Sequence, residues 1–142
     1  MTKALFAPVA LAAAIFGAAS FAQDTPTPNL SMEDVVVRAG QSMEFSEVTM
    51  DQAGWIVIHD GVAGAPVGPS LTQVFVNPGV HQGVLVPLEG GFEAGKEYII
   101  SLHYDSNGNG TWDHETNPAD DGPVIRADGS VYSLPFVMQA AQ

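Results

Sequence analysis

The chain reads Tyr98-Ile99-Ile100-Ser101-Leu102-His103-Tyr104 and continues as Asp105-Ser106-Asn107-Gly108-Asn109-Gly110-Thr111-Trp112-Asp113. The first run is short and rich in β-branched and aromatic residues. It is followed at once by Asn and Gly, which is typical of a strand that ends in a turn. No long stretch of the chain has apolar residues at the spacing of an amphipathic helix. The stretch therefore predicts a protein built from strands.

Similar short runs recur on both sides of this stretch, separated by Gly, Pro and Asn. We predict about seven strands: Glu33 to Arg38, Ser42 to Met50, Trp55 to Asp60, Leu71 to Val76, Val80 to Leu88, Lys96 to Tyr104 and Val131 to Met138. In the second run Met43 and Phe45 share one parity, whereas Val48 and Met50 share the other. This change of parity indicates a bulge near Ser46.

Short strands, frequent turns and the lack of a helical period favour an all-β fold, an antiparallel β-sandwich of immunoglobulin-like type. The chain contains no cysteine, so the disulfide of many immunoglobulin domains is impossible. Trp55 is expected to be a core tryptophan. Pro135 has no N–H to donate, so the last strand should lie at an edge or be bulged there.

The N-terminus has the pattern of a secretory signal peptide, residues 1–22. Lys3 precedes an apolar, alanine-rich run, and Ser20-Phe21-Ala22 offers small residues at the cleavage positions. We expect cleavage near Ala22 and a mature protein in the periplasm or outside the cell. A membrane anchor is the alternative, although the apolar run is short for one.

The mature chain is expected to hold one domain. Residues 23–30 contain Thr25-Pro26-Thr27-Pro28 and should form an extended leader. Residues 31–142 then form a single β-sandwich domain, a length that suits one hydrophobic core.

The chain is strongly acidic, with a formal net charge of −12 at pH 7. Without Lys3, three cations (Arg38, Lys96 and Arg126) face sixteen carboxylates, which gives a net charge of −13. Such a surface repels nucleic acid and anionic lipid, and it favours divalent cations. We therefore expect no nucleic-acid partner and no membrane span in the mature chain. The partner would be a protein or a surface polymer of unknown identity.

The loop after Tyr104 has the spacing of a calcium-binding loop. Side-chain oxygens occur at loop positions one, three, five and nine, with a glycine at position six and a carbonyl donor at position seven. The predicted calcium ligands are Asp105, Asn107, Asn109, Thr111 through its carbonyl, and Asp113.

Two features depart from the usual calcium loop. The preceding segment is a strand and not a helix, and position twelve is Thr116 in place of a bidentate glutamate. Glu115, Asp120 and Asp121 are near enough in sequence to complete the shell. The alternative is a turn that binds nothing, because Asn and Gly also serve turns by tolerating positive φ.

Several blocks of the chain, in their order, resemble a known family. They are Gly54-Trp55-Ile56-Val57-Ile58-His59, Gly79-Val80-His81, Leu102-His103-Tyr104-Asp105, Asn107-Gly108-Asn109-Gly110-Thr111-Trp112-Asp113 and Asp121-Gly122-Pro123. On these blocks the chain is similar, over roughly residues 35–137, to a domain of unknown function found in secreted and surface proteins of halophilic archaea and some bacteria. The resemblance implies an extracytoplasmic β-sandwich module and supplies no mechanism.

Three histidines within these blocks, His59, His81 and His103, lie at strand edges or turns. If their strands are neighbours and their faces coincide, the imidazoles could hold copper or zinc. Met43 and Met50 could add soft ligands for Cu(I). The alternative is that each histidine makes separate hydrogen bonds. His114 lies in the acidic loop and is expected to face solvent.

Enzymatic motifs are missing from the sequence: there is no nucleophile elbow, HExxH helix, phosphate loop or thiol. The leading hypothesis is an exported, non-catalytic β-sandwich module that is stabilised by calcium and acts in binding or in surface or periplasmic structure. The second is a periplasmic transition-metal protein that uses the three histidines. The third is a hydrolase of unknown type.

Overall fold

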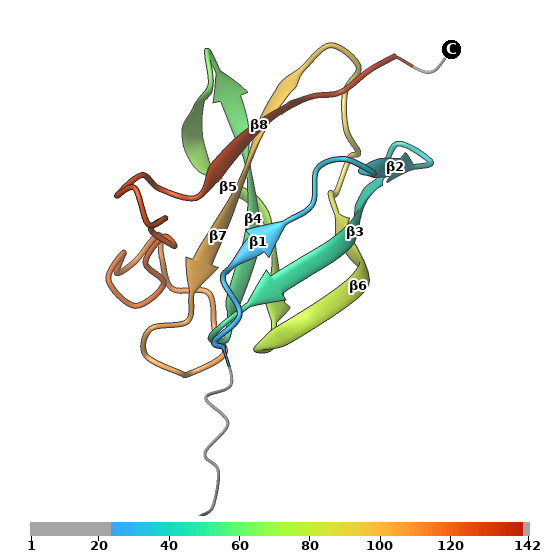
Figure 1. Ribbon diagram of the computed structural model, residues 1–142. Helices are drawn as coiled ribbons and strands as arrows, with labels where there is room; N and C mark the ends of the chain where they lie inside the picture. Colours follow the sequence, from blue (N-terminus) through green and yellow to red (C-terminus); the bar gives the residue numbers. More distant parts are fainter. Residues whose placement is uncertain (1–23, 141–142) are drawn as a thin grey trace, which may run out of the picture.

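The computed structural model describes residues 24–140, so the predicted signal peptide lies outside the described residues. Within that range the chain forms eight strands and no helix (Figure 1). The strands are β1 (Asn29–Leu30), β2 (Val36–Arg38), β3 (Ser42–Met50), β4 (Gly54–Val62), β5 (Ala65–Val76), β6 (Gly79–Pro87), β7 (Glu97–Tyr104) and β8 (Ser133–Val137).

The strands form two four-stranded sheets, and every pairing is antiparallel. In the first sheet β3 pairs with β6 along one side and with β1 and β2 along the other. The second sheet has the order β5-β4-β7-β8. The chain crosses between the sheets three times, from β3 to β4, from β5 to β6 and from β6 to β7. The predicted antiparallel β-sandwich of immunoglobulin-like type is confirmed.

Each of the seven predicted strands has an observed counterpart, but the structure differs from the prediction in two places. Asn29 and Leu30, which we assigned to the extended leader, form β1 and pair with Thr49 and Val48 of β3. β5 begins at Ala65 and not at Leu71. The sequence from Ala65 to Ser70 is rich in Pro and Gly, and an edge strand tolerates proline because one side of its backbone needs no partner.

The predicted change of parity occurs in β3, but the pairing of β3 with β6 keeps the same register on both sides of Ser46. Met43, Phe45, Val48 and Met50 are all buried, so both halves of the strand face the core. Phe45 pairs with Val84 and Glu47 with Gln82, and Ser46 between them is left out of the ladder. The opposing position is Gly83, at a φ of 64°, so both strands deform together and the pairing resumes in register.

The main core lies between the two sheets. Its largest side chains are fully buried and come from both sheets: Met43, Phe45, Met50, Ile56, Ile58, Tyr98, Ile100 and Leu102. A second buried layer lies on the other face of the second sheet. It contains Trp55, Val57 and Ile99. Trp55 is therefore buried as predicted, but outside the main core.

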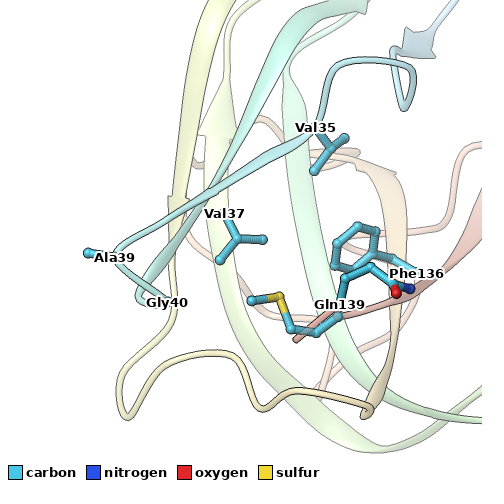
Figure 2. Close-up of a pocket in the computed structure, with 7 residues that line it drawn as sticks. Val35, Val37, Ala39, Gly40, Phe136 and Gln139 are labelled. Carbon is cyan, nitrogen blue, oxygen red and sulfur yellow. The ribbon is translucent and has the colours of Figure 1, made fainter. Parts of the chain in front are cut away.

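An open, mostly apolar groove of about 540 Å³ runs between β2 and the chain around β8. Figure 2 shows Val35 and Val37 on one side of this groove and Phe136 on the other. Its lining residues include no titratable side chain. The chemistry predicted from the sequence therefore lies elsewhere, at the end of β7.

Candidate functional site

The site is built where β7 leaves the second sheet. β7 pairs with β4 on one side and β8 on the other, and residues from Tyr98 to His103 are buried. Beyond the strand, the N–H of Asp105 donates to the carbonyl of Ala53 at 3.0 Å. The N–H of Ser106 donates to the carbonyl of Asp120 at 2.8 Å. The first bond holds the start of the loop against the turn before β4, and the second holds it against the later part of the segment between β7 and β8.

The segment between β7 and β8 lies on the side of the second sheet that faces away from the first sheet (Figure 1). It covers the outer face, where the register places Trp55 opposite His103 and Val57 opposite Ser101. This cover explains why Ser101 and His103 are buried although they do not point into the main core. The outer layer is therefore a second packed layer, made of aromatic and polar groups.

The side chains of the predicted calcium loop gather on one side of the loop. Asp105 Oδ1 accepts the N–H of Asn109 at 3.2 Å, and its Oδ2 accepts the N–H of Gly110 at 2.9 Å. Asn107 Oδ1 accepts the same Asn109 N–H at 3.1 Å. Both side-chain oxygens accept the N–H of Asn109, so the side chains of Asp105 and Asn107 point toward the same position. Gly108 and Gly110 have φ values of 70° and 66°, which allow this tight turn.

The remaining predicted ligands continue the same arrangement. Asn109 Oδ1 accepts the N–H of Thr111 at 2.7 Å, and Asn109 Nδ2 donates to Asp113 Oδ2 at 2.7 Å. All four predicted side chains, Asp105, Asn107, Asn109 and Asp113, are thus joined in one local network. Such a loop supplies oxygen atoms of the kind that Ca²⁺ prefers.

The three acidic residues considered as additional ligands have different surroundings. Glu115 accepts the N–H of Ser70 at 3.1 Å and also its hydroxyl, so it faces β5. Burial raises the pKa of Glu115, but the bonds from Ser70 outweigh that effect and hold it below its usual range. Asp120 touches the loop through its carbonyl. Asp121 is fully buried.

Asp121 connects the loop to the second sheet through both of its functional groups. Its carboxylate accepts the indole N–H of Trp55 at 2.9 Å and also the backbone N–H of Asp113. Its backbone carbonyl lies 2.8 Å from His103 Nδ1 and 2.9 Å from His114 Nδ1. One residue, Asp121, therefore positions both the loop after β7 and the two imidazoles.

His103 and His114 form a close pair of rings. Their centroids are 4.8 Å apart at an interplanar angle of 82°. Trp112 stacks on His114, with centroids 5.3 Å apart and an interplanar angle of 27°, and meets the edge of His103 at 5.1 Å. His114 is half-buried in this arrangement, which differs from the solvent-facing position that we expected.

A cavity of about 300 Å³ opens beside this pair. Its polar lining consists of the side chains of His59, Ser101, His103, His114 and Ser133, and its apolar walls include Pro66, Pro123 and Val131. His59 Nδ1 is buried and has no hydrogen-bond partner among the described residues. The cavity therefore holds imidazole groups from β4, β7 and the loop.

The electrostatics of this cavity disfavour protonation of His103. Burial lowers the pKa of His103 to about 4. The carbonyl of Asp121 opposes this shift, and the neighbouring His114 and His59 add to it. His103 is thus a neutral imidazole at neutral pH.

The structure does not bring the three predicted histidines together. His59 and His103 line the same cavity, but His81 lies in β6 of the first sheet, opposite Val48. His81 Nε2 is 2.8 Å from the carbonyl of Asn77, so it makes a separate local hydrogen bond. Met43 and Met50 are fully buried in the main core and do not line the cavity.

Sequence reasoning missed His114 and Asp121 as the residues that organise the site. His114 was assigned to solvent because it follows the acidic loop directly, although its neighbour Trp112 was an unusual aromatic residue for such a loop. Between residues 24 and 140, no group of three or more His, Cys, Asp or Glu side chains is arranged to hold a metal ion. A three-histidine centre is therefore not preformed there.

The fold and the site define an all-β sandwich module with an oxygen-rich loop and an imidazole-lined cavity at one end of its second sheet. The chain belongs to the family described as Domain of unknown function (DUF7282), which matches residues 28–137. No curated protein and no solved structure matches the chain. In the part of the chain that is described, no helix is long and apolar enough to cross a membrane.

Proposed function

We propose that this protein is an exported, non-catalytic β-sandwich module, stabilised by calcium at the loop after β7, that acts in binding or in surface or periplasmic structure. The observation that carries the calcium proposal is the convergence of Asp105 and Asn107 on one N–H group, with Asn109 and Asp113 joined to them. The absence of catalytic motifs from the sequence supports a non-catalytic role.

The donor set of the loop suits calcium and suggests weak binding. The side chains of Asp105, Asn107, Asn109 and Asp113 and the carbonyl of Thr111 would supply hard oxygen ligands. Only two of these groups are charged, and the bidentate glutamate is missing. We expect a dissociation constant of about 10⁻⁴–10⁻³ M, as in extracellular modules.

Calcium would act on more than the loop itself. Asp113 donates its N–H to the carboxylate of Asp121, which also accepts the indole N–H of Trp55 in β4. Ordering the loop would therefore secure the segment that covers the outer face of the second sheet. The cation would also relieve part of the repulsion within a strongly acidic chain.

Export is supported by the signal-peptide pattern, the acidic composition and the resemblance to domains of secreted proteins. We expect N-terminal sequencing of the exported protein to begin at Gln23. Recovery of a membrane-bound form that retains Met1 would contradict the proposed export and cleavage.

The calcium proposal is tested by thermal unfolding with calcium and with a chelator. Calcium at about ten times its dissociation constant should stabilise the fold by about 1.4 kcal/mol, because only the folded loop binds it. A domain of this size should then melt about 3–6 °C higher. The Asp105→Ala, Asp113→Ala double variant should lose this response.

A matched control separates specific binding from general charge screening. The Asp24→Ala, Asp34→Ala variant removes the same charge from two exposed positions outside the loop. It should keep the full calcium response. If millimolar calcium stabilises the wild type no more than the loop variant, the loop is only a turn.

A further inference from the structure

The loop after β7 contains the two Asn-Gly pairs of the chain, Asn107-Gly108 and Asn109-Gly110. Asparagine before glycine is the pair most prone to deamidate without an enzyme, because glycine has no Cβ to hinder its backbone nitrogen. All four residues are exposed, so water reaches the side-chain amides of both pairs. Residue type and spacing do not distinguish the two pairs, but their hydrogen bonds in the structure do.

The backbone nitrogen that must attack the side chain differs between the pairs. The N–H of Gly110 donates to the carboxylate oxygen Oδ2 of Asp105 at 2.9 Å. The N–H of Gly108 donates to the carbonyl oxygen of Asp105 at a longer distance, 3.2 Å. A hydrogen bond to a charged acceptor is about twice as strong as one to a neutral group. The carboxylate also opposes loss of the amide proton, because two negative charges would then be adjacent. The nitrogen of Gly108 is therefore the easier one to deprotonate.

The side-chain amides differ in the same direction. Asn109 is held at both ends: its Oδ1 accepts the N–H of Thr111 at 2.7 Å, and its Nδ2 donates to Asp113 Oδ2 at 2.7 Å. Asn107 Oδ1 accepts the N–H of Asn109 at 3.1 Å, and its Nδ2 has no hydrogen-bond partner among residues 24–140. Rotation of the Asn107 side chain toward the backbone nitrogen therefore breaks one long bond, whereas the same rotation of Asn109 breaks two short ones.

We propose that Asn107 is a site of spontaneous deamidation and that Asn109 is protected from it. The deprotonated nitrogen of Gly108 attacks Cγ of Asn107, a C–N bond forms, and the Cγ–Nδ2 bond breaks. The nitrogen leaves as ammonia, and the proton that it takes up balances the one lost by Gly108. Water then opens the cyclic imide at either carbonyl, which gives aspartate or isoaspartate. The sum of these steps exchanges an amide for a carboxylate, consumes one water and involves no oxidation.

The aspartate product changes the charge of the loop, and its functional effect rests on the proposed calcium site. The new carboxylate and that of Asp105 both point toward the N–H of Asn109, so they repel each other when no cation is present. In the calcium-bound loop the charged side chains rise from two to three, and ligand charge sets the affinity of such loops. The isoaspartate product instead lengthens the main chain by one carbon and loses the spacing of the loop.

The test is peptide mapping by mass spectrometry after incubation of the purified protein at neutral pH with a chelator. Trypsin releases residues 97–126 as one peptide, and its fragmentation assigns the mass change to one asparagine. Asn107 should convert at least about tenfold faster than Asn109, because a charge-assisted hydrogen bond changes a barrier by this much. Faster conversion at Asn109, or none at either residue, would overturn the proposal.

Two variants test the structural reason for the difference. Asp113→Ala removes the acceptor of Asn109 Nδ2 and should accelerate the conversion of Asn109 while that of Asn107 stays the same. Asp24→Ala is the matched control, since it removes the same charge outside the loop and should alter neither rate. Asn109 that stays equally slow in the Asp113 variant would contradict protection by its hydrogen bonds. If that variant does not fold, the comparison within the wild type decides.

A calcium titration separates this modification from the calcium proposal. Asn107→Asp should bind calcium about tenfold more tightly than the wild type, because it adds a charged ligand. Deamidation of Asn107 in a protein that binds no calcium in either form would support the modification site and contradict the calcium site. Calcium binding in a protein whose Asn107 does not deamidate would contradict the modification site alone.

Discussion

At the scale of single residues, Asp121 organises the site. It is fully buried, and its carboxylate has two N–H donors, from Trp55 and Asp113. Its carbonyl holds His103 and His114. A buried carboxylate is tolerated only when such donors compensate for its lost hydration. The residue therefore links packing, loop position and imidazole orientation.

We expect Asp121→Asn to destabilise the fold by about 1–3 kcal/mol, because the amide leaves one buried N–H group facing another donor. Chemical denaturation with a chelator present measures this loss. Asp120→Asn is the control. It removes the same charge at the adjacent position, and the Asp120 side chain makes no hydrogen bond within the described chain. Equal stabilities of the two variants would show that the Asp121 carboxylate is not structurally required.

At the scale of elements, β7 contributes side chains to both buried layers, the core between the sheets and the layer on the outer face of the second sheet. One of its faces contributes Tyr98, Ile100 and Leu102 to the core between the sheets. Its other face contributes Ser101 and His103 to the cavity. A strand that is buried on both sides needs neighbours on both edges, and β4 and β8 supply them. The site thus rests on a strand of the second sheet that is held on both faces and along both edges.

The short strand β1 depends on a contact from the opposite end of the chain. The hydroxyl of Tyr132, just before β8, accepts the N–H of Leu30 at 2.7 Å. It also lies 3.1 Å from Asn29 Oδ1. Leu30 is itself buried in the main core. One hydroxyl group therefore joins β1 to the residue just before β8, 102 positions away in the chain.

Tyr132→Phe should cost about 1–3 kcal/mol, because it leaves the buried Leu30 N–H without its acceptor. Hydrogen exchange should accelerate most at the amides of β1, while those of β4 and β7 change only with global stability. Tyr104→Phe serves as a comparison, since its hydroxyl bonds to Asp51 in a more accessible position. Unchanged exchange at Leu30 in the Tyr132 variant would contradict this role.

At the scale of the whole molecule, negative charge is the dominant feature. The chain has sixteen carboxylates against four Lys and Arg residues. In the described part, the salt bridges engage only a few of these carboxylates: Arg38 pairs with Glu44, and Lys96 with Asp60 and Glu93. The other acids repel one another across the surface, which opposes the compact state.

Added sodium chloride should therefore raise the melting temperature in the presence of a chelator. The screening length falls from about 30 Å at 0.01 M salt to about 10 Å at 0.1 M. A variant with Asn or Gln at four exposed acids, Asp24, Glu33, Asp34 and Glu89, should respond less. A salt response that is the same in this variant would mean that the surface repulsion is not its cause.

Local patterns were sufficient to predict most of the architecture. The strand from Ser42 to Met50 was predicted with the observed bounds, and the parity change near Ser46 was visible in the sequence. Side-chain alternation is a property of a single strand, so it can be recognised without knowing the partner strand. The loop from Asp105 to Asp113 was likewise recognisable, because its hydrogen bonds connect residues only a few positions apart.

The partners of each element could not be predicted in this way. β1 was assigned to the leader because two residues carry no detectable period, and its pairing with β3 depends on a distant strand. β5 was shortened because Pro66 and Pro69 usually end strands. Strand β5 tolerates these prolines because it lies at the edge of its sheet, and that position is a property of the assembled sheet.

The sequence by itself determined most of the strands, the acidic composition and the oxygen-rich loop, because each follows from residue type and short-range spacing. Only the tertiary structure decided which histidines meet. His81 resembles His59 and His103 in its local setting, yet the crossing from β5 to β6 carries it into the other sheet. His114 lies beside His103 because both rings bond to the backbone carbonyl of Asp121, which the chain brings back to the end of β7. Such contacts join separate elements, and no local spacing encodes them.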